Sequence, residues 1–229
     1  MQLFFTNNTE DEFFLESEES KHICKVLRKK EGERIFFTDG KGSLITGNIV
    51  NAGIKKTKIK VISREKKKKH NYFLHIAISP TKNIQRYQWF LEKATEIGID
   101  EITPIICSHS ERKRINIERC NKMLISALKQ SIRYHLPKLN ECKRLSDLLD
   151  DDFIGEKYIA HCHEKKKLKL NKIKTKKNNL ILIGPEGGFS QKEVDIAIIN
   201  NFQPISLADN RLRTETAGII ATHTINIQN

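Results

Sequence analysis

The sequence predicts two domains, a small β-rich domain followed by a larger α/β domain. Closely spaced strand patterns with one helix fill the first third of the chain, and strands that alternate with helices fill the rest. Between these two regions, residues 65–70 form a charged run without apolar side chains, which is typical of a linker. We therefore expect one domain over residues 1–68 and a second domain over residues 70–229.

The first domain is predicted to be a small, barrel-like arrangement of strands. Residues 33–38 alternate between polar and apolar side chains, as a strand with one buried face does. The sequence DGKG at 39–42 is typical of a tight turn, and residues 43–50 have the pattern of the returning strand. Residues 58–63 add another strand, and the apolar spacing in residues 19–29 predicts a short helix.

The second domain is predicted to be a parallel sheet covered by helices on both faces. Apolar strand patterns and helical patterns alternate along it, as they do in successive βαβ units. The expected strands cover residues 72–79, 101–107, 157–161, 180–184 and 204–207. The expected helices cover residues 84–97, 117–128, 193–200 and 214–227.

The charge of the chain favours a polyanionic partner. Lys and Arg number 41 against 28 Asp and Glu, so the formal net charge is +13, which is typical of proteins that bind nucleic acid. A lysine-rich genome would give the same charge without such a partner. The lysine-rich residues 165–179 are expected to form an exposed loop, which is either an RNA-contacting arm or a plain connection.

The sequence shows no signal for a membrane, a disulfide framework or a metal. No apolar run is long enough to span a bilayer and no signal-peptide pattern is present, so we expect a soluble, cytoplasmic product. The five cysteines are scattered and form no C-x-x-C pair. His161, Cys162 and His163 superficially resemble a metal cluster, but alternate side chains of the preceding strand point to opposite faces. We therefore expect no metal.

A glycine-rich segment follows one predicted strand of the second domain. In LILIGPEGGFS, at 180–190, the strand runs into Gly184 and a pair of glycines, and Ser190 with Glu193 has the pattern of a helix capping box. Ligands bind at the carboxyl ends of parallel strands, and paired glycines allow the backbone to approach a ligand closely. The segment has neither a Walker A lysine nor a G-x-G-x-x-G pattern, which lowers the support for P-loop and Rossmann proteins. Taken alone, the segment is a weak signal, because a Gly-Gly pair after a strand usually forms an ordinary turn.

A second segment, ISLADNRLRTETA at 205–217, also leaves a predicted strand and enters the last helix. Arg211 and Arg213 beside the helix N-terminus would attract an anion. Taken alone, two surface arginines with Thr214 or Thr216 as an ordinary helix cap explain the pattern more simply. The two segments are much more specific together than either is alone.

Together, GPEGGFS and LxxxRLRTETA resemble the ribosomal RNA small-subunit methyltransferase E family of the SPOUT superfamily. The resemblance covers essentially the whole chain, although Ala208 stands where the family usually has glycine. The other matching segments are Arg86 with LEKATEIG at 91–98, SER at 110–112, ALKQS at 127–131 with LP at 136–137, His22 with VLR at 26–28, and DGKG at 39–42.

The resemblance implies an N-terminal PUA-like RNA-binding β-barrel and a C-terminal SPOUT-type methyltransferase domain with a deep trefoil knot. It also implies a homodimer that uses S-adenosyl-L-methionine to methylate N3 of a uridine in 16S rRNA, either as free rRNA or in the assembled small ribosomal subunit. The residues expected to bind the cofactor are Ile183, Gly184, Pro185, Glu186, Gly187, Gly188, Leu207, Ala208, Leu212, Arg213 and Thr214.

On the same basis, Arg28, Arg86 and Arg112 are expected to contact RNA, and Arg213 is expected to act in catalysis. Glu215 is a candidate for the proton acceptor, although a salt bridge or a cap of the last helix would explain it as well. Three other functions stay open: a SPOUT methyltransferase that acts on another RNA nucleotide, a non-catalytic RNA-binding protein, and an unrelated enzyme whose glycine loop binds a different nucleotide.

Overall fold

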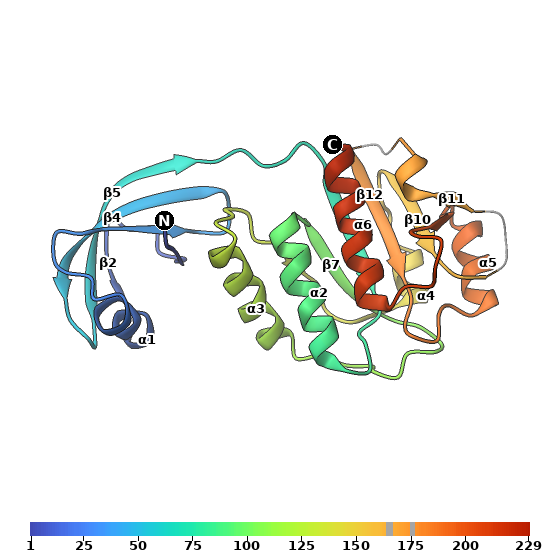
Figure 1. Ribbon diagram of the computed structural model, residues 1–229, viewed down its shortest axis with the longest axis horizontal. Coiled ribbons are helices and arrows are strands. Elements are labelled where there is room, and N and C mark those ends of the chain that lie inside the picture. The colour runs from blue at the N-terminus through green and yellow to red at the C-terminus, as the bar shows by residue number, and fades with distance from the viewer. Residues whose placement is uncertain (164–166, 175–176) are drawn as a thin grey trace. The chain divides into compact units, whose positions relative to one another are not determined.

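The computed structural model describes residues 1–163, 167–174 and 177–229, which form two compact units (Figure 1). Unit 1 comprises Met1–Lys69 and Leu128–Leu136, and unit 2 comprises His70–Ala127 and Pro137–Asn229. Unit 1 thus includes Leu128–Leu136, although the sequence pattern placed these residues in the second domain. The charged run at 65–70 is not purely a linker, because its first two residues belong to a strand.

Unit 1 is built on a curled five-stranded sheet whose strands follow the order β1-β3-β4-β5-β2. β1 pairs with β3 in parallel, and every other pairing in this sheet is antiparallel. The two register shifts between β4 and β5 add local twist, which helps the sheet to curl. The five strands are β1 (Leu3–Phe5), β2 (Glu12–Leu15), β3 (Arg34–Thr38), β4 (Ser43–Ala52) and β5 (Thr57–Lys66).

A short helical segment completes the core of unit 1. The sequence predicted one helix over residues 19–29, whereas the structure has α1 (Ser17–Lys21) followed by a π-helical turn, η1 (His22–Val26). The inward side chains of the strands alternate with outward ones, as a sheet with one buried face requires. The core consists of Phe4, Phe13, Leu15, Ile23, Ile35, Phe37, Ile45, Ile49 and Ile59.

The DGKG turn at 39–42 holds the distant segment 128–136 within unit 1. The Gly40 carbonyl accepts a hydrogen bond of 2.8 Å from the backbone N–H of Leu136, and the N–H of Gly42 donates one of 2.8 Å to the Tyr134 carbonyl. Gly40 and Gly42 have φ values of +68° and +91°, and a side chain at Gly42 would overlap the ring of His135. Glycine is therefore needed here both for the turn and for the close approach.

Unit 2 contains a parallel sheet, as the alternation of strands and helices predicted. Every strand pair in the described part of this sheet is parallel, and the order is β11-β13-β10-β12-β6-β7-β8, with β9 also paired to β7. The longer strands are β6 (Phe73–Ile78), β7 (Glu101–Ile106), β10 (Glu156–Ala160), β12 (Asn178–Ile183) and β13 (Gln203–Ser206). The short strands are β8 (Lys138–Leu139), β9 (Lys143–Arg144) and β11 (Leu168–Lys169).

Helices cover both faces of this sheet. α2 and α6 pack against each other on one face, and a side chain at Gly218 of α6 would lie 2.5 Å from the ring of Phe90 in α2. Ile78 of β6 lies on this same face, because it also approaches Gly218. The helices are α2 (Ile84–Ile97), α3 (Ile117–Gln130), α4 (Leu145–Leu149), α5 (Gln191–Ile199) and α6 (Thr214–Gln228).

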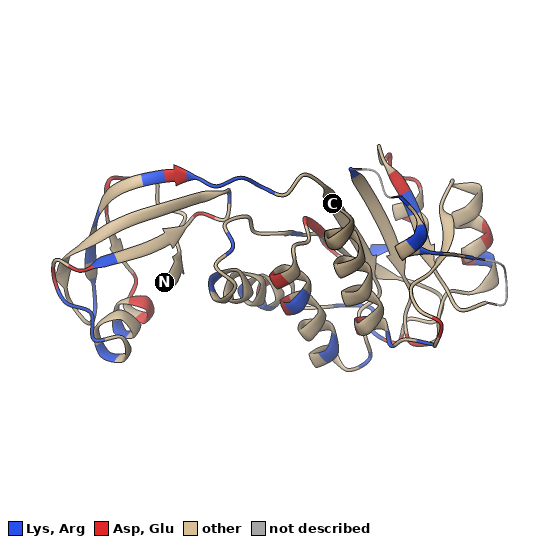
Figure 2. Cartoon of the chain, turned by 45° about the horizontal axis from the view of Figure 1, so that its top comes forward, with Lys and Arg blue, Asp and Glu red and all other residues tan. Residues whose placement is uncertain are grey.

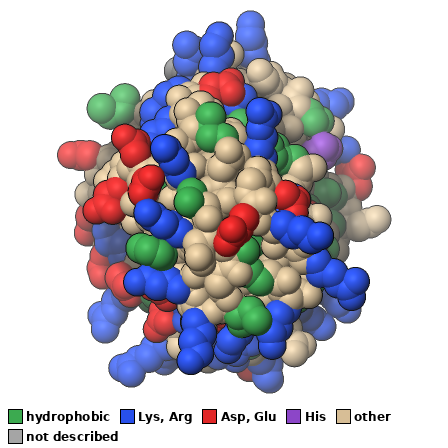
Figure 3. Space-filling view, turned by 90° about the vertical axis from the view of Figure 1, so that its left-hand side faces the viewer, with side chains coloured by type: hydrophobic (Ala, Val, Ile, Leu, Met, Phe, Trp, Pro, Cys, Tyr) green, Lys and Arg blue, Asp and Glu red, His purple; other side chains and the backbone are tan. Residues whose placement is uncertain are grey.

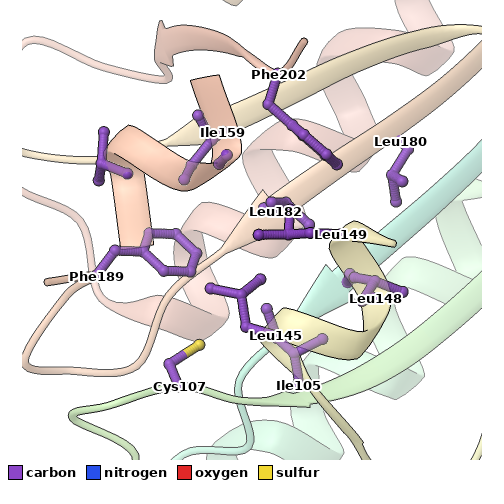
Figure 4. Close-up of a cluster of buried hydrophobic side chains, with 13 residues drawn as sticks. Ile105, Cys107, Leu145, Leu148, Leu149, Ile159, Leu180, Leu182, Phe189 and Phe202 are labelled. Atoms are coloured by element: carbon purple, nitrogen blue, oxygen red, sulfur yellow. The ribbon is translucent and has the colours of Figure 1, made fainter. Parts of the chain in front are cut away.

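The opposite face carries a cluster of buried apolar side chains (Figure 4). Ala77, the neighbour of Ile78 in β6, belongs to this cluster, since successive residues of a strand point to opposite faces. Residues of α4 and α5 pack there onto Leu180 and Leu182 of β12. The cluster therefore anchors the strand that leads into the glycine-rich segment.

The lysine-rich segment 165–179 is not entirely the exposed loop that the sequence predicted. It contributes β11 and the short helix η2 (Leu170–Lys172), in which Leu170 is buried. Residues 165, 166, 175 and 176 of this segment lie outside the described residues. Lys and Arg residues are dispersed along the chain (Figure 2), and on the face seen in Figure 3 their side chains lie among acidic and hydrophobic ones. None of the described helices has the length and apolar character needed to cross a membrane.

Candidate functional site

The carboxyl ends of three parallel strands meet at one edge of the unit 2 sheet. β10 lies between β12 and β13 and pairs with both. Loops leaving these three ends surround a pocket of about 520 Å³, here called the first pocket. Small-molecule sites typically enclose roughly 300–1,000 Å³ and lie at such strand ends in parallel sheets. The first pocket is therefore the best candidate for a ligand site.

The first pocket brings together every residue that was expected to bind the cofactor. Segments 183–188 and 207–214 form two of its walls. The structure adds lining residues that the sequence had not assigned to the cofactor: Ala160, His161, Cys162, His163, Phe189, Ile205, Ser206, Asn210, Ala217 and Arg211, which the sequence predicted only as an anion-attracting side chain. Several of these follow β10, and the sequence alone does not reveal that β10 lies between β12 and β13.

The glycine-rich wall is a tight turn. The N–H of Gly188 donates a hydrogen bond of 2.8 Å to the carbonyl of Pro185, and Gly188 has a φ of +73° with open space where a side chain would stand. A Cβ atom at Gly187 would lie 2.9 Å from Cβ of His109. Gly187 is thus required by packing and Gly188 by backbone conformation.

The helix that follows the turn begins with the predicted capping box. Ser190 Oγ accepts a hydrogen bond from the N–H of Glu193, whose Oε2 accepts one of 2.7 Å from the N–H of Ser190. Glu193 Oε1 also accepts one of 2.7 Å from the N–H of Ser108, beyond the end of β7. Burial alone would raise the pKa of Glu193, but the donors at Ser190 and Ser108 outweigh it and lower the pKa. Glu193 therefore stays ionised and fixes the loop.

Two hydrogen bonds join the two main walls of the first pocket. The buried Thr214 Oγ1 donates to the carbonyl of Gly184 at 3.0 Å, and the guanidinium of Arg211 donates to the carbonyl of Glu186 at 3.1 Å. Arg213 lines the pocket as the N-cap residue of α6, and its side chain is exposed and makes no capping hydrogen bond. Among the described residues the Arg213 guanidinium has no partner, so the pocket presents it at a helix N-terminus.

Residues 161–163 form the third wall. The argument from alternating strand faces does not hold for them, because β10 ends at Ala160 and the rings of His161 and His163 lie 5.3 Å apart. His163 Nε2 is 2.9 Å from the carbonyl oxygen of Phe189, and Lys167 Nζ donates to the carbonyls of both histidines. Over the described residues, no three His, Cys, Asp or Glu side chains are grouped so that they could hold a metal ion.

A second pocket of about 460 Å³ adjoins the first. Its lining consists of Lys82, Asn83, Arg86, Glu111 and Glu186, and Glu186 lines both pockets. The backbone N–H of Lys82 donates a hydrogen bond of 2.9 Å to Glu186 Oε1. This bond ties Glu186, the residue shared by the two pockets, to the loop between β6 and α2.

The remaining predicted residues occupy different places. Arg112 donates to the carbonyls of Thr81 and Lys82 at 3.1 and 2.8 Å, and so supports the second pocket. Glu215 is buried and does not line the first pocket; its Oε1 lies 3.7 Å from Nε of Arg86. Arg28 belongs to unit 1, where it is exposed and has a φ of +54°. The structure therefore groups Arg86, Arg112 and Glu215 around the second pocket.

Comparisons with known proteins match both units. A family model described as an RNA methyltransferase domain matches residues 68–226, and one described as an RNA methyltransferase PUA domain matches residues 15–63. The ribosomal RNA small subunit methyltransferase E of Rickettsia conorii (strain ATCC VR-613 / Malish 7) is 30% identical over 212 residues, which cover 90% of this chain and 86% of the relative.

Two solved structures are similar over almost the full length of the chain. A probable rRNA-methyltransferase from Porphyromonas gingivalis is 37% identical and superposes with a TM-score of 0.94, covering 100% of this chain and 98% of that one. A ribosomal RNA small subunit methyltransferase E from Neisseria gonorrhoeae, bound to S-adenosyl methionine, is 24% identical with a TM-score of 0.89 and coverages of 99% and 97%. At 24% identity, the similarity to the Neisseria protein shows a shared fold.

Proposed function

Since the chain belongs to the ribosomal RNA small subunit methyltransferase E family, we propose that it transfers a methyl group from S-adenosyl-L-methionine to N3 of one uridine in 16S-type rRNA. The observation that carries this proposal is the first pocket, where segments 183–188 and 207–214 meet at the carboxyl ends of parallel strands. The proposal also includes a homodimer with a trefoil knot that acts in the cytoplasm.

The residues of the first pocket suit this cofactor. Ile183, Leu207 and Leu212 offer apolar surface to a flat adenine ring. In the described part of the chain, the turn leaves the peptide N–H groups of Glu186 and Gly187 for the polar parts of the molecule, and the open space at Gly188 lets a ligand approach the backbone. The Neisseria relative, which has the same fold, is bound to S-adenosyl methionine.

When bound, the cofactor supplies an electrophilic methyl group on a sulfonium. The chain supplies positioning and charge stabilisation. N3 of uridine carries a proton, and its loss spreads negative charge onto the neighbouring carbonyl oxygens. The exposed guanidinium of Arg213, at the N-terminus of α6 and on the pocket wall, is placed to stabilise that charge.

The remaining contacts place the RNA. We assign residues 1–68 to a PUA-like RNA-binding domain and residues 70–229 to the methyltransferase domain. Arg28 is exposed on the first domain, Arg86 lines the second pocket of the other, and Arg112 lines an adjoining pocket that shares Lys82 and Glu111 with it. Each is a candidate for RNA contact, since a guanidinium donates hydrogen bonds to phosphate oxygens and to base carbonyl oxygens.

The direct test is methyl transfer in vitro from labelled S-adenosylmethionine to free 16S rRNA and to small ribosomal subunits. Nucleoside mass spectrometry should identify 3-methyluridine, and the better substrate of the two shows the state in which the RNA is recognised. Arg213→Ala should lower turnover about 100-fold or more while the circular dichroism spectrum stays unchanged. Turnover like that of the wild type would refute the role of Arg213. A different methylated nucleoside, or RNA binding without transfer, would identify one of the alternative functions.

A further inference from the structure

Glu215 is a buried carboxylate whose hydrogen-bonding capacity is incompletely used. Its side chain is 8% exposed and stands in the first turn of α6, directly after two residues that line the first pocket. Within the described residues, no hydrogen-bond donor reaches its buried Oε2 atom. A buried charge is costly unless it is paired, so a carboxylate in this position needs a reason beyond packing.

Glu215 faces the guanidinium of Arg86, and Arg86 lines the second pocket. Nε of Arg86 lies 3.7 Å from Glu215 Oε1, and the Arg86 side chain is 41% exposed. A guanidinium has five N–H donors, and in the described part of the chain this ion pair is the one side-chain interaction of Arg86. Arg86 therefore keeps donors for a ligand while Glu215 holds it from the buried side.

The position of the second pocket indicates what that ligand is. Glu186 forms a wall of both pockets, so a group in the second pocket adjoins a molecule in the first. Lys82 and Arg86 contribute positive charge there, and Glu111 and Glu186 negative charge. Lys82 is paired with Glu111 at 2.8 Å, however, whereas Arg86 faces Glu215. Given the proposed function, on which this inference rests, the group that must adjoin the cofactor is the uracil ring to be methylated.

We propose that the second pocket receives the target uracil, that Arg86 donates a hydrogen bond to one of its carbonyl oxygens, and that Glu215 is a positioning residue that holds Arg86 there. The N3 proton passes to water, and the resulting anion is stabilised at its carbonyl oxygen by Arg86. The bond between N3 and the methyl carbon then forms as the bond between that carbon and sulfur breaks. The uracil ring is neutral again after transfer.

The test is a set of variants measured for kcat, for the dissociation constant of S-adenosylmethionine and for the pH dependence of the rate. Arg86→Ala should lower kcat about 100-fold, and Glu215→Gln about tenfold. Cofactor affinity should stay within about twofold of the wild type in both variants, because neither side chain lines the first pocket. A tenfold weaker stabilisation of the uracil anion should also shift the rising limb of the pH–rate profile upward by about one unit.

Two further variants separate positioning from a merely structural role. Adding Glu215→Gln to Arg86→Ala should cause no further loss of kcat, because Glu215 then has nothing to position. Glu92→Gln is the matched control, since Glu92 also pairs with a cation on α2, at 2.8 Å from Lys93, and lines neither pocket. It should leave kcat and the pH profile unchanged.

The inference is overturned if Glu215→Gln keeps the kcat and pH profile of the wild type, or if the losses of the two single variants multiply in the double variant. If Glu215→Gln does not fold, Arg86→Ala still tests the proposal, because the Arg86 side chain is half-exposed and its loss should not unfold the protein. Unchanged kcat in Arg86→Ala contradicts the proposal. A wild-type protein that methylates no RNA would instead contradict the proposed function, so the two failures can be told apart.

Discussion

The hydrogen bond between Thr214 and Gly184 ties the two walls of the first pocket together, and Thr214→Val removes it with little change in shape. Thr214 Oγ1 donates to the Gly184 carbonyl at 3.0 Å, and both residues are buried. The valine variant leaves that carbonyl without its donor, which costs about 1–3 kcal/mol of unfolding free energy. For a chain of this size, each kcal/mol lowers Tm by about 2–4 °C.

The same substitution should weaken cofactor binding, because the spacing of the two walls is no longer fixed. We expect a dissociation constant for S-adenosylmethionine about tenfold higher in isothermal titration calorimetry, which corresponds to about 1.4 kcal/mol. Thr222→Val is the control: Thr222 is also buried in α6 and donates a hydrogen bond of 2.8 Å to the Gly218 carbonyl, and neither residue lines the pocket. It should leave cofactor affinity unchanged. Wild-type affinity in Thr214→Val would refute the reasoning.

Three other predictions concern packing, pH and RNA binding. Gly218→Ala should lower the unfolding free energy by about 1–3 kcal/mol in urea denaturation, because the new methyl group would lie 2.5 Å from the buried Phe90 ring. Burial lowers the pKa of His75 to about 4, so its neutral form stabilises the fold above pH 6.5, and up to about 3 kcal/mol should be lost as the pH falls from 6.5 toward 4. A flat stability profile over that range, or the same slope in His75→Gln, would contradict this. Arg28→Ala should reduce the log–log salt slope of RNA binding by about one unit, and an unchanged slope with unchanged affinity would rule out its phosphate contact.

The regular elements of the second domain were predictable because each carries its own periodicity. The apolar runs before Ser79 and Gly184 and the helical spacing that ends at Gly98 have direct counterparts in β6, β12 and α2. The two-residue strands β8, β9 and β11 were missed, because they are defined by a neighbouring strand and have no local pattern. The π-helical turn after Lys21 was missed because the apolar spacing of residues 19–29 indicates a helix but not its hydrogen-bonding pattern.

Of the three walls of the first pocket, only segments 183–188 and 207–214 could be predicted, because these two carry sequence motifs. Sheet order is set by tertiary packing, so nothing local indicated that the residues after Ala160 lie between the other two walls. The ion pair of Glu215 with Arg86 was likewise hidden, because it joins helices more than a hundred residues apart in the chain. Gly42 could be assigned to a turn, but not to the close approach of His135.

The central claim is that the first pocket serves methylation of one small-subunit rRNA uridine. The most direct measurement is nucleoside and fragment mass spectrometry of 16S-type rRNA from a strain that lacks the gene. We expect the loss of a single 3-methyluridine, its return with the wild-type gene and no return with Arg213→Ala. An rRNA methylation profile that is unchanged by the deletion would contradict the proposed function.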